Sequence, residues 1–181
     1  MSGAQQYYEI TCCRLCGSTY IETVLVLKPT PPANNLITAS DLGQKPTCYP
    51  LEVCRCADCH HLQLRHIVNP ELLFSNYLYV SQTSPVMLRH LADQAENLAG
   101  RIKGSGNNFV IEIGSNDGSL LRNFQRHGFP VLGVDPARNI ADQAVAAGVP
   151  TIVEFFGEAV GRRLAAEHGR AGLVCANHCF A

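Results

Sequence analysis

The sequence contains no block of lysine and arginine residues and no long uninterrupted apolar segment. Its 14 Lys and Arg side chains nearly balance its 15 Asp and Glu side chains, which gives a formal net charge of −1. Without a basic stripe, we expect no nucleic-acid partner. No apolar run is long enough to span a bilayer, and the first residues, MSGAQQYYEI, do not form a basic segment followed by an apolar core. We therefore predict a soluble, cytoplasmic protein without a membrane partner.

Cysteine, in contrast, is abundant and unevenly distributed. Seven of the nine cysteines lie between Cys12 and Cys59, and the other two lie near the C-terminal end. Cytoplasmic thiols stay reduced, and an odd total with local C-x-x-C pairs indicates metal binding rather than a disulfide framework. The cysteine-rich front predicts a zinc-binding module over residues 1–69. Within it, residues 27–47 are rich in proline, asparagine and other turn-forming residues and are expected to form a surface loop. A bridging segment with a helix is expected over residues 70–106, and a second domain over residues 107–181.

Two C-x-x-C turns carry the metal prediction. Structural zinc takes four ligands in a tetrahedral array, often thiolates supplied by two such turns. Four neighbouring residues are alternative ligands, namely Cys12, Cys54, His60 and His61, but none of them belongs to a C-x-x-C turn. The predicted ligands are therefore Cys13, Cys16, Cys56 and Cys59.

The second domain alternates between expected strands and helices. Four segments are typical of short buried strands: FVIEI, PVLGVD, PTIVEF and AGLVCAN. Helical stretches that end in glycine separate them, and the second of these helices is expected to begin at Pro136. This alternation predicts an α/β fold with a doubly wound, Rossmann-like parallel sheet. The preceding helix is expected to begin at Ser84 and Pro85, a favoured N-cap and first-turn pair. Only four strands are expected, so we predict a partial sheet whose remaining strands belong to a C-terminal region of the same protein.

The turn after the first of these strands lacks the features of a dinucleotide or phosphate site. Its glycines, Gly114 and Gly118, have the spacing G-x-x-x-G, with Ser115 where the middle glycine of G-x-G-x-x-G would lie, and no P-loop lysine is present. Two carboxylates, Glu112 and Asp117, flank the turn. They would repel a pyrophosphate but suit the sulfonium and ammonium groups of S-adenosylmethionine. This cofactor is therefore predicted, with an NAD-dependent oxidoreductase as a less favoured alternative.

Further residues extend the expected cofactor site. Asp135 ends the second strand, where an acidic side chain can accept hydrogen bonds from ribose hydroxyls. Phe155 and Phe156 follow the third strand, where adenine is usually sandwiched, although both also fit a core position. Asn116 lies within the acidic turn, and Asp117 fits a simple helix cap as well as a ligand contact.

Six stretches together resemble the sugar C-methyltransferases of nucleotide-deoxysugar biosynthesis. They are CRLCG, PPANNL, YPLEVCRCADCHHLQL, PELLFSNYLYVSQTS, VIEIGSNDGSLL and VLGVDPARNIA. The resemblance implies a four-cysteine zinc module, a class I S-adenosylmethionine-dependent methyltransferase domain and a further C-terminal domain. It also implies the reaction: a base removes the proton alpha to the carbonyl of a nucleotide-linked keto-deoxysugar, and the enolate takes the methyl group.

The resemblance further implies roles for residues before the sheet. Tyr77 and Tyr79 are similar to an aromatic pair that places a phenol beside the sugar, as an acid, a base or a positioning group. Ser81 and Ser84 are expected near the methionine end of the cofactor, although Ser84 also fits a helix cap. Asn177 completes the set of expected cofactor contacts.

The family's catalytic histidine falls beyond the last residues, so this chain alone is not expected to turn over. A non-catalytic zinc-stabilised module that binds a cofactor or a partner is the main alternative.

Overall fold

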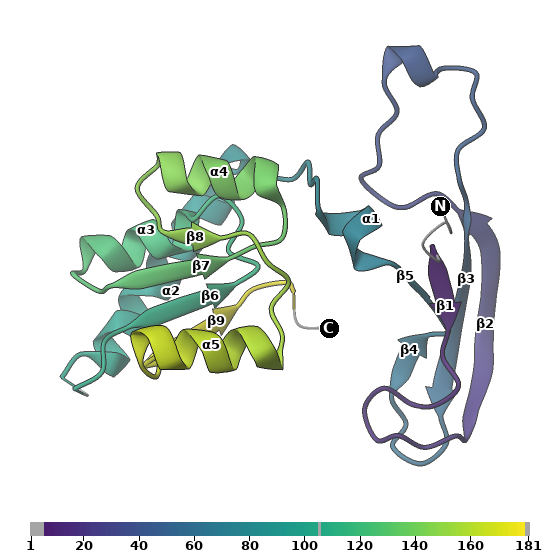
Figure 1. Ribbon diagram of the computed structural model, residues 1–181, viewed down its shortest axis with the longest axis horizontal. Coiled ribbons are helices and arrows are strands. Elements are labelled where there is room, and N and C mark those ends of the chain that lie inside the picture. Colours follow the sequence, from purple (N-terminus) through teal and green to yellow (C-terminus); the bar gives the residue numbers. More distant parts are fainter. Residues whose placement is uncertain (1–5, 105, 180–181) are drawn as a thin grey trace. The chain divides into compact units, whose positions relative to one another are not determined.

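The computed structural model describes residues 6–104 and 106–179. The chain divides into two compact units, Met1–Leu73 and Phe74–Ala181, which are labelled in Figure 1 by their strands and helices. In the sequence, two short helices follow the last strand of the first unit, α1 (Pro70–Phe74) and the 3-10 helix η2 (Ser81–Thr83). Among the described residues, the structure shows no helix with the length and apolar character needed to cross a membrane.

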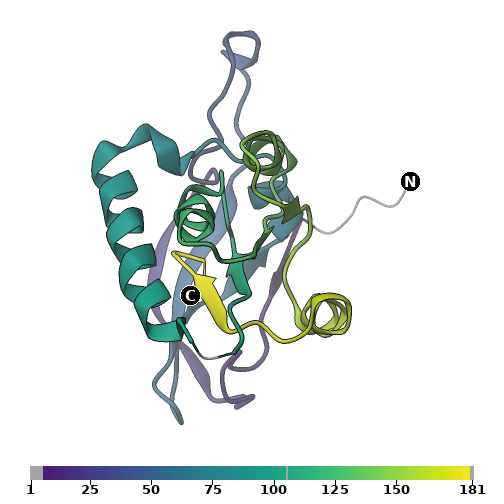
Figure 2. The same cartoon turned by 90° about the vertical axis from the view of Figure 1, so that its left-hand side faces the viewer.

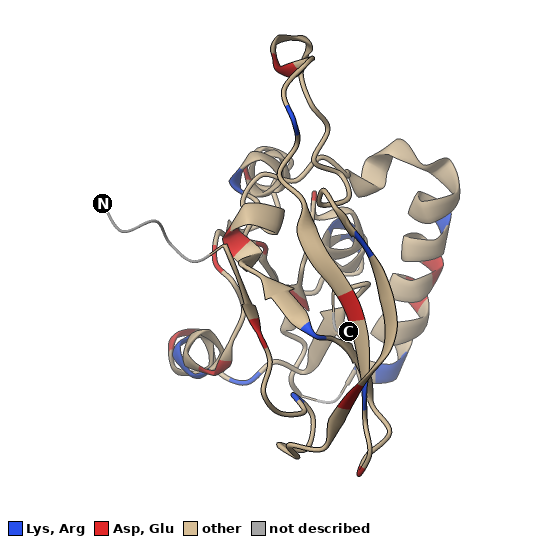
Figure 3. Cartoon of the chain, turned by 90° about the vertical axis from the view of Figure 1, so that its right-hand side faces the viewer, with Lys and Arg blue, Asp and Glu red and all other residues tan. Residues whose placement is uncertain are grey.

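The front unit is built from antiparallel strands. The strand β3 (Tyr49–Cys56) pairs with β2 (Ile21–Thr30) on one side and with β4 (Leu62–Leu64) on the other, and β1 (Tyr7–Glu9) pairs with β5 (His66–Val68). Charged residues are scattered along these strands and do not gather on one of them (Figure 3).

The longest strand, β2, was not predicted. Residues 27–47 were expected to form a surface loop, but Leu27–Thr30 continue β2 and pair with the start of β3. Four consecutive apolar residues, Val24–Leu27, conceal the alternation that identifies a strand in sequence. In the rest of the predicted loop, the structure contains the single 3-10 turn η1 (Ala39–Asp41).

The back unit contains the predicted parallel sheet. Its strands follow the order β8–β7–β6–β9, and every neighbouring pair is parallel. Their bounds are β6 (Val110–Ile113), β7 (Val131–Val134), β8 (Thr151–Ile152) and β9 (Leu173–Ala176). The third strand, β8, is shorter than the predicted segment PTIVEF, because only two of its residues pair with β7.

Helices cover both faces of this sheet, as Figures 1 and 2 show. Apolar side chains of α2 (Pro85–Ile102), α3 (Ser119–Arg126) and α4 (Arg138–Ala146) form one buried cluster with Val110. On the opposite face, Leu164 of α5 packs with Ile111 and with two residues of β7. Burial on both faces explains why these strands have continuous apolar sequences without alternation.

The bounds of the helices follow local capping. The helix α2 begins at Pro85, and the Ser84 hydroxyl accepts the Met87 N–H at 3.3 Å, as the predicted N-cap requires. In contrast, α4 begins at Arg138 rather than at Pro136. The reason is that the carboxylate of Asp135 accepts the Ala137 N–H at 2.9 Å and holds these residues in a turn before the helix.

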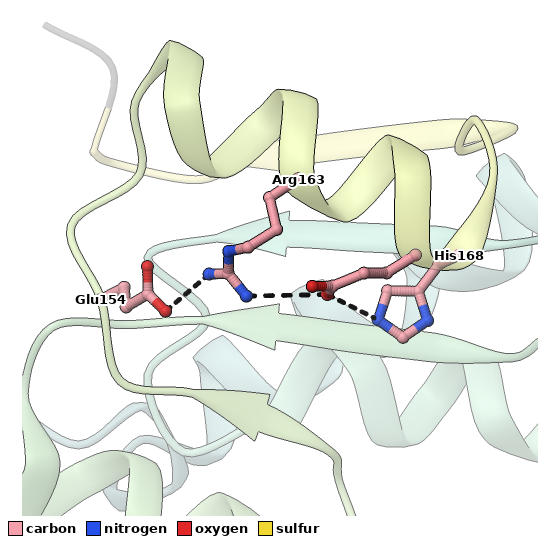
Figure 4. A network of polar contacts seen from close by, with 4 residues as sticks. Glu154, Arg163 and His168 are labelled. Carbon is pink, nitrogen blue, oxygen red and sulfur yellow. Dashed lines mark hydrogen bonds and ion pairs between the residues drawn. The ribbon is translucent and has the colours of Figure 1, made fainter.

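A network of ion pairs joins α5 (Glu158–His168) to the loop after β8 (Figure 4). Arg163 lies 2.6 Å from Glu154 and 3.6 Å from Glu167, which in turn lies 3.9 Å from His168. Because these side chains are exposed, each pair contributes at most about 1 kcal/mol. The network holds the chain immediately before Phe155.

Candidate metal and cofactor sites

Two turns of the front unit bring four thiols together. The first is closed by a hydrogen bond from the Gly17 N–H to the Cys13 carbonyl at 2.9 Å, and Gly17 has a φ of 76°, which favours glycine. The second turn joins β3 to β4, and there the His60 N–H donates to the Cys56 carbonyl at 3.0 Å. The pairing of Ile21 with Cys56 in the β2–β3 ribbon places the second turn next to the chain that follows the first.

The four sulfur atoms have the spacing of a tetrahedral zinc site. Cys13 Sγ lies 3.6 Å from Cys59 Sγ, Cys16 Sγ lies 3.6 Å from Cys56 Sγ, and all four atoms lie within 4.8 Å of one another. Zinc–sulfur bonds of about 2.3 Å in a tetrahedron would separate the sulfurs by roughly 3.8 Å. The cluster therefore fits zinc, and its ligand set is the predicted one.

Hydrogen bonding prepares this cluster for a cation. A backbone N–H bond from Cys16 lowers the pKa of Cys13 to about 6, which favours the thiolate that zinc requires. The backbone N–H of Ser18 acts in the same direction on Cys16, but the neighbouring sulfur of Cys59 and burial raise the pKa of Cys16 to about 12. The thiolates repel one another without a positive charge between them, and a divalent cation removes that repulsion.

Among the described residues, the alternative cysteine ligands lie outside the four-sulfur cluster. Cys12 is exposed, and Cys54 is buried with its thiol directed to the carbonyl of Gln63 at 3.5 Å. With four thiolates as ligands, zinc has no open coordination position for a water or a substrate. The metal is therefore structural, and it stabilises a unit that is too small to form a large apolar core.

Three buried carboxylates lie at the carboxyl-terminal edge of the parallel sheet in the back unit. Glu112 is the last but one residue of β6, Asp117 lies in the following turn, and Asp135 follows β7. Their exposed fractions are 4%, 2% and 7%. The ends of neighbouring parallel strands meet at one edge, which is where open α/β sheets bind ligands. Among the described residues, none of the three forms an ion pair with a basic side chain. No basic side chain therefore offsets the negative charge that these carboxyl groups carry when they ionise.

Glu112 is the least satisfied of the three. Its Oε1 accepts a hydrogen bond from Asn177 Nδ2 at 3.3 Å, while its Oε2 is buried without a partner among the described residues. Burial, and then the charges of Asp117 and Asp135, raise the pKa of Glu112 to about 8. Asn177 is oriented by Gln94 of α2, whose Nε2 donates to Asn177 Oδ1 at 3.1 Å. A buried carboxyl oxygen without a partner is costly, and a cationic group of a ligand would satisfy it.

The other two carboxylates are oriented by backbone N–H groups. Asp135 accepts the N–H of Asn116 at 2.8 Å and that of Ala137 at 2.9 Å, and burial raises its pKa. Asp117 accepts the N–H of Gln82 at 2.9 Å and that of Ser119 at 3.0 Å. Ser119 is the first residue of α3, so Asp117 satisfies a free N–H at the start of that helix, while the N-cap position itself is Gly118.

The glycines of the acidic turn are required by its shape. Gly114 and Gly118 have φ angles of 64° and 72°, and a Cβ at Gly118 would lie 2.9 Å from a methyl group of Val149. Ser115, at the place of the absent middle glycine, is buried with its side chain against Gly133 of β7. The turn therefore packs tightly on the sheet.

Residues 77–83, which we call the strap, are fastened to the same edge. Asn139 of α4 accepts the Tyr77 N–H at 3.1 Å and donates to the Tyr77 carbonyl at 2.7 Å. Asn116 accepts the Ser81 N–H at 3.0 Å and donates to the Tyr79 carbonyl at 3.0 Å. The structure thus brings both predicted tyrosines to the acidic edge. Sequence reasoning did not identify Asn139, and nothing in its local sequence, RNIADQ, distinguishes it.

For four predicted cofactor contacts, the described residues show no hydrogen bond from the side chain to this edge. Phe155 and Phe156 are each 41% exposed. Phe156 lines a shallow pocket with Gly161 and Leu164 of α5, on the face of the sheet that Ile111 shares. The Ser84 hydroxyl caps α2, and Ser81 is held through its backbone.

Two comparisons with known proteins concern the front unit and the chain as a whole. Residues 13–74, nearly all of the front unit, match a family described as "Putative zinc binding domain". The matched residues include all four cysteines of the cluster. C-methyltransferase NovU of Streptomyces niveus is 38% identical to the chain over 169 residues, which are 93% of this chain and 40% of the relative. The predicted resemblance to a C-methyltransferase is thereby confirmed, and the chain spans less than half the length of that relative.

A solved structure also shares part of the chain. Magnesium protoporphyrin IX methyltransferase (ChlM) from Synechocystis PCC 6803, with bound SAM, is 14% identical and has a TM-score of 0.33. The match covers 44% of this chain and 43% of that chain. A likeness of this size transfers neither a ligand nor an activity.

Proposed function

We propose that the chain is part of an S-adenosylmethionine-dependent C-methyltransferase that acts on a nucleotide-linked keto-deoxysugar. The observation that carries the proposal is the unpartnered, buried Oε2 of Glu112 at the carboxyl-terminal edge of a parallel sheet. It occurs in a chain that is 38% identical to a C-methyltransferase. A cationic ligand is the chemistry that this oxygen and the two neighbouring carboxylates favour.

The residues of the acidic edge fit S-adenosylmethionine. Glu112 would bind the positively charged methionine end, where its free oxygen needs a donor or a cation. Asp135 would bind the ribose, because each of its oxygens accepts one backbone N–H and keeps a second lone pair for a hydroxyl. When bound, this cofactor supplies a methyl group already activated on a sulfonium. NAD fits less well, since its pyrophosphate would meet the same uncompensated carboxylates.

The tyrosines of the strap are proposed to face the sugar. Tyr79 is 43% exposed, Tyr77 is half-buried, and both are held through their backbone carbonyls beside the acidic edge. A phenol hydroxyl that donates to the carbonyl oxygen of the substrate would stabilise the negative charge that develops there as the alpha proton leaves. Methyl transfer then requires only that the enolate carbon and the methyl group be aligned, which is a matter of positioning.

Titration calorimetry with S-adenosylmethionine and NAD⁺ tests the cofactor. We expect S-adenosylmethionine to bind more tightly, and the substitution Glu112→Gln to weaken it at least about tenfold through loss of a buried charged partner. Glu96→Gln, an exposed change on α2, is the matched control and should leave binding unchanged. Tighter binding of NAD⁺, or equal binding by both variants, would contradict the proposal.

The sugar substrate needs a separate measurement. A protein with the full length of the relative should transfer a labelled methyl group from S-adenosylmethionine to a nucleotide-linked 4-keto-6-deoxysugar. A nucleotide-linked sugar without the keto group is the control, because it has no acidic alpha proton. Equal labelling of both sugars would exclude the enolate mechanism.

A further inference from the structure

The strap is held to the rest of the back unit by the side chains of three residues. Its backbone groups at Tyr77, Tyr79, Ser81 and Gln82 form five hydrogen bonds to side chains that follow β6 and β7. The side chains are Asn116, Asp117 and Asn139. Within the part of the chain that the structure describes, the strap pairs with no strand. Its position along the edge is therefore set by these side chains.

Each asparagine attaches the strap at two points. An amide side chain offers a carbonyl oxygen that accepts and an NH₂ group that donates, and Asn139 uses both on the same residue, Tyr77, with bonds of 3.1 and 2.7 Å. Asn116 bridges from the Tyr79 carbonyl to the Ser81 N–H, with two bonds of 3.0 Å. Two-point attachment fixes the orientation of the backbone as well as its distance from the sheet.

The two asparagines differ in their relation to the cofactor edge. The N–H of Asn116 donates to Asp135 Oδ2 at 2.8 Å, so Asn116 joins the strap to a residue of the proposed cofactor site. Asn139 lies in the first turn of α4. Within the described residues, its side chain bonds to Tyr77, and its carbonyl accepts a hydrogen bond from the side chain of Gln143 on the same helix. A change at Asn139 therefore releases Tyr77 without removing a contact to the three carboxylates.

We propose that Asn139 is a positioning residue of the methyl-transfer reaction, which holds the backbone of Tyr77 so that its side chain meets the sugar beside the cofactor. The inference rests on the proposed function, because it requires that Tyr77 face the substrate. Its consequence is a separation of effects. Loss of the Asn139 amide weakens the use of the sugar and spares the binding of the cofactor.

The test compares three variants of the full-length enzyme. Asn139→Ala removes both bonds, and Asn139→Asp keeps an acceptor for the Tyr77 N–H and loses the donor. Gln143→Ala is the control, since Gln143 is exposed on the next turn of α4 and donates only to the Asn139 carbonyl at 3.0 Å. We expect kcat/KM for the sugar to fall roughly 10- to 100-fold in Asn139→Ala, as misplacement of a reacting group by about 1 Å produces. Asn139→Asp should recover part of this loss, and the affinity for S-adenosylmethionine should change less than about twofold in all three.

Hydrogen exchange gives a readout that does not depend on activity. The amide of Tyr77 should exchange faster in Asn139→Ala than in the wild type, while the amides of β6 and β7 keep their protection. Unchanged exchange at Tyr77, or an unchanged kcat/KM for the sugar, would overturn the proposal. An equal loss of affinity for S-adenosylmethionine would also overturn it, because the residue would then act on the whole edge. If the wild type bound S-adenosylmethionine and did not methylate any keto sugar, the proposed function would fail. Exchange at Tyr77 would then decide separately whether Asn139 holds the strap.

Discussion

The buried carboxyl of Glu112 makes the stability of the back unit depend on pH in a direction opposite to that of most carboxylates. Burial first, and then the charges of Asp117 and Asp135, raise its pKa from the ordinary value of 4.5 to about 8. Between these two values the folded unit keeps the proton and the unfolded chain releases it. The folded state binds more protons over this range, so the free energy of unfolding falls as the pH rises. This contribution is complete below pH 4.5 and is lost by the time the pH passes 8.

The size of the effect follows from the shift. One pKa unit corresponds to 1.36 kcal/mol, and the range from pH 5 to pH 8 covers most of the interval between the two values, so Glu112 should remove about 3 kcal/mol of stability across it. Glu112→Gln removes the titrating group and keeps the Oε1 that accepts the Asn177 amide. The pKa of Asp135 is also raised by burial, but its contribution is present in both proteins. The difference between wild type and variant therefore isolates Glu112.

Urea denaturation at pH 5, 6, 7 and 8, without cofactor, measures this difference. Circular dichroism follows unfolding, and reaction of the Cys175 thiol identifies the transition of the back unit, because Cys175 is buried and lies opposite Glu112 in the β6–β9 register. The wild type should lose about 3 kcal/mol more than Glu112→Gln between the ends of the series. Glu96→Gln should follow the wild type. Parallel curves for wild type and Glu112→Gln would refute the reasoning, since they would mean that Glu112 is already ionised in the folded protein at pH 5.

Three further predictions concern the cofactor, the metal and the acidic turn. Affinity for S-adenosylmethionine should rise between pH 6 and pH 8, by up to about tenfold per unit as Glu112 ionises, and calorimetry should find a flatter profile in Glu112→Gln. Elemental analysis should find one zinc per chain in protein purified without added metal, and Cys56→Ser should abolish it and unfold the front unit, while exchange protection in β6 and β7 persists. Gly118→Ala should destabilise the back unit by about 1–3 kcal/mol, through its positive φ and the approach to Val149. Gly148→Ala, which has a similar φ but open space around it, should cost less in the same urea titration.

The local sequence was sufficient for the parts of this protein that depend on near neighbours. Two C-x-x-C turns identified the four sulfurs of the zinc cluster, because each turn is closed within a few residues. The Ser84–Pro85 pair located the start of α2, since an N-cap bonds to an N–H only three residues away. The alternation of strand and helix predicted the parallel sheet, and the acids at the ends of its first two strands predicted the edge at which they gather. The strand β2 escaped prediction, because its four consecutive apolar residues do not alternate.

Only the tertiary structure decided how the acidic edge is organised. The bonds between Asn139 and Tyr77 join residues 62 positions apart, and the bond between Asn177 and Glu112 joins residues 65 apart. No local pattern marks such pairs, because an asparagine in the first turn of a helix usually faces water. The burial that raises the pKa of Glu112 is likewise a property of the packed sheet and helices around β6, and the same glutamate in an exposed strand would be an ordinary carboxylate.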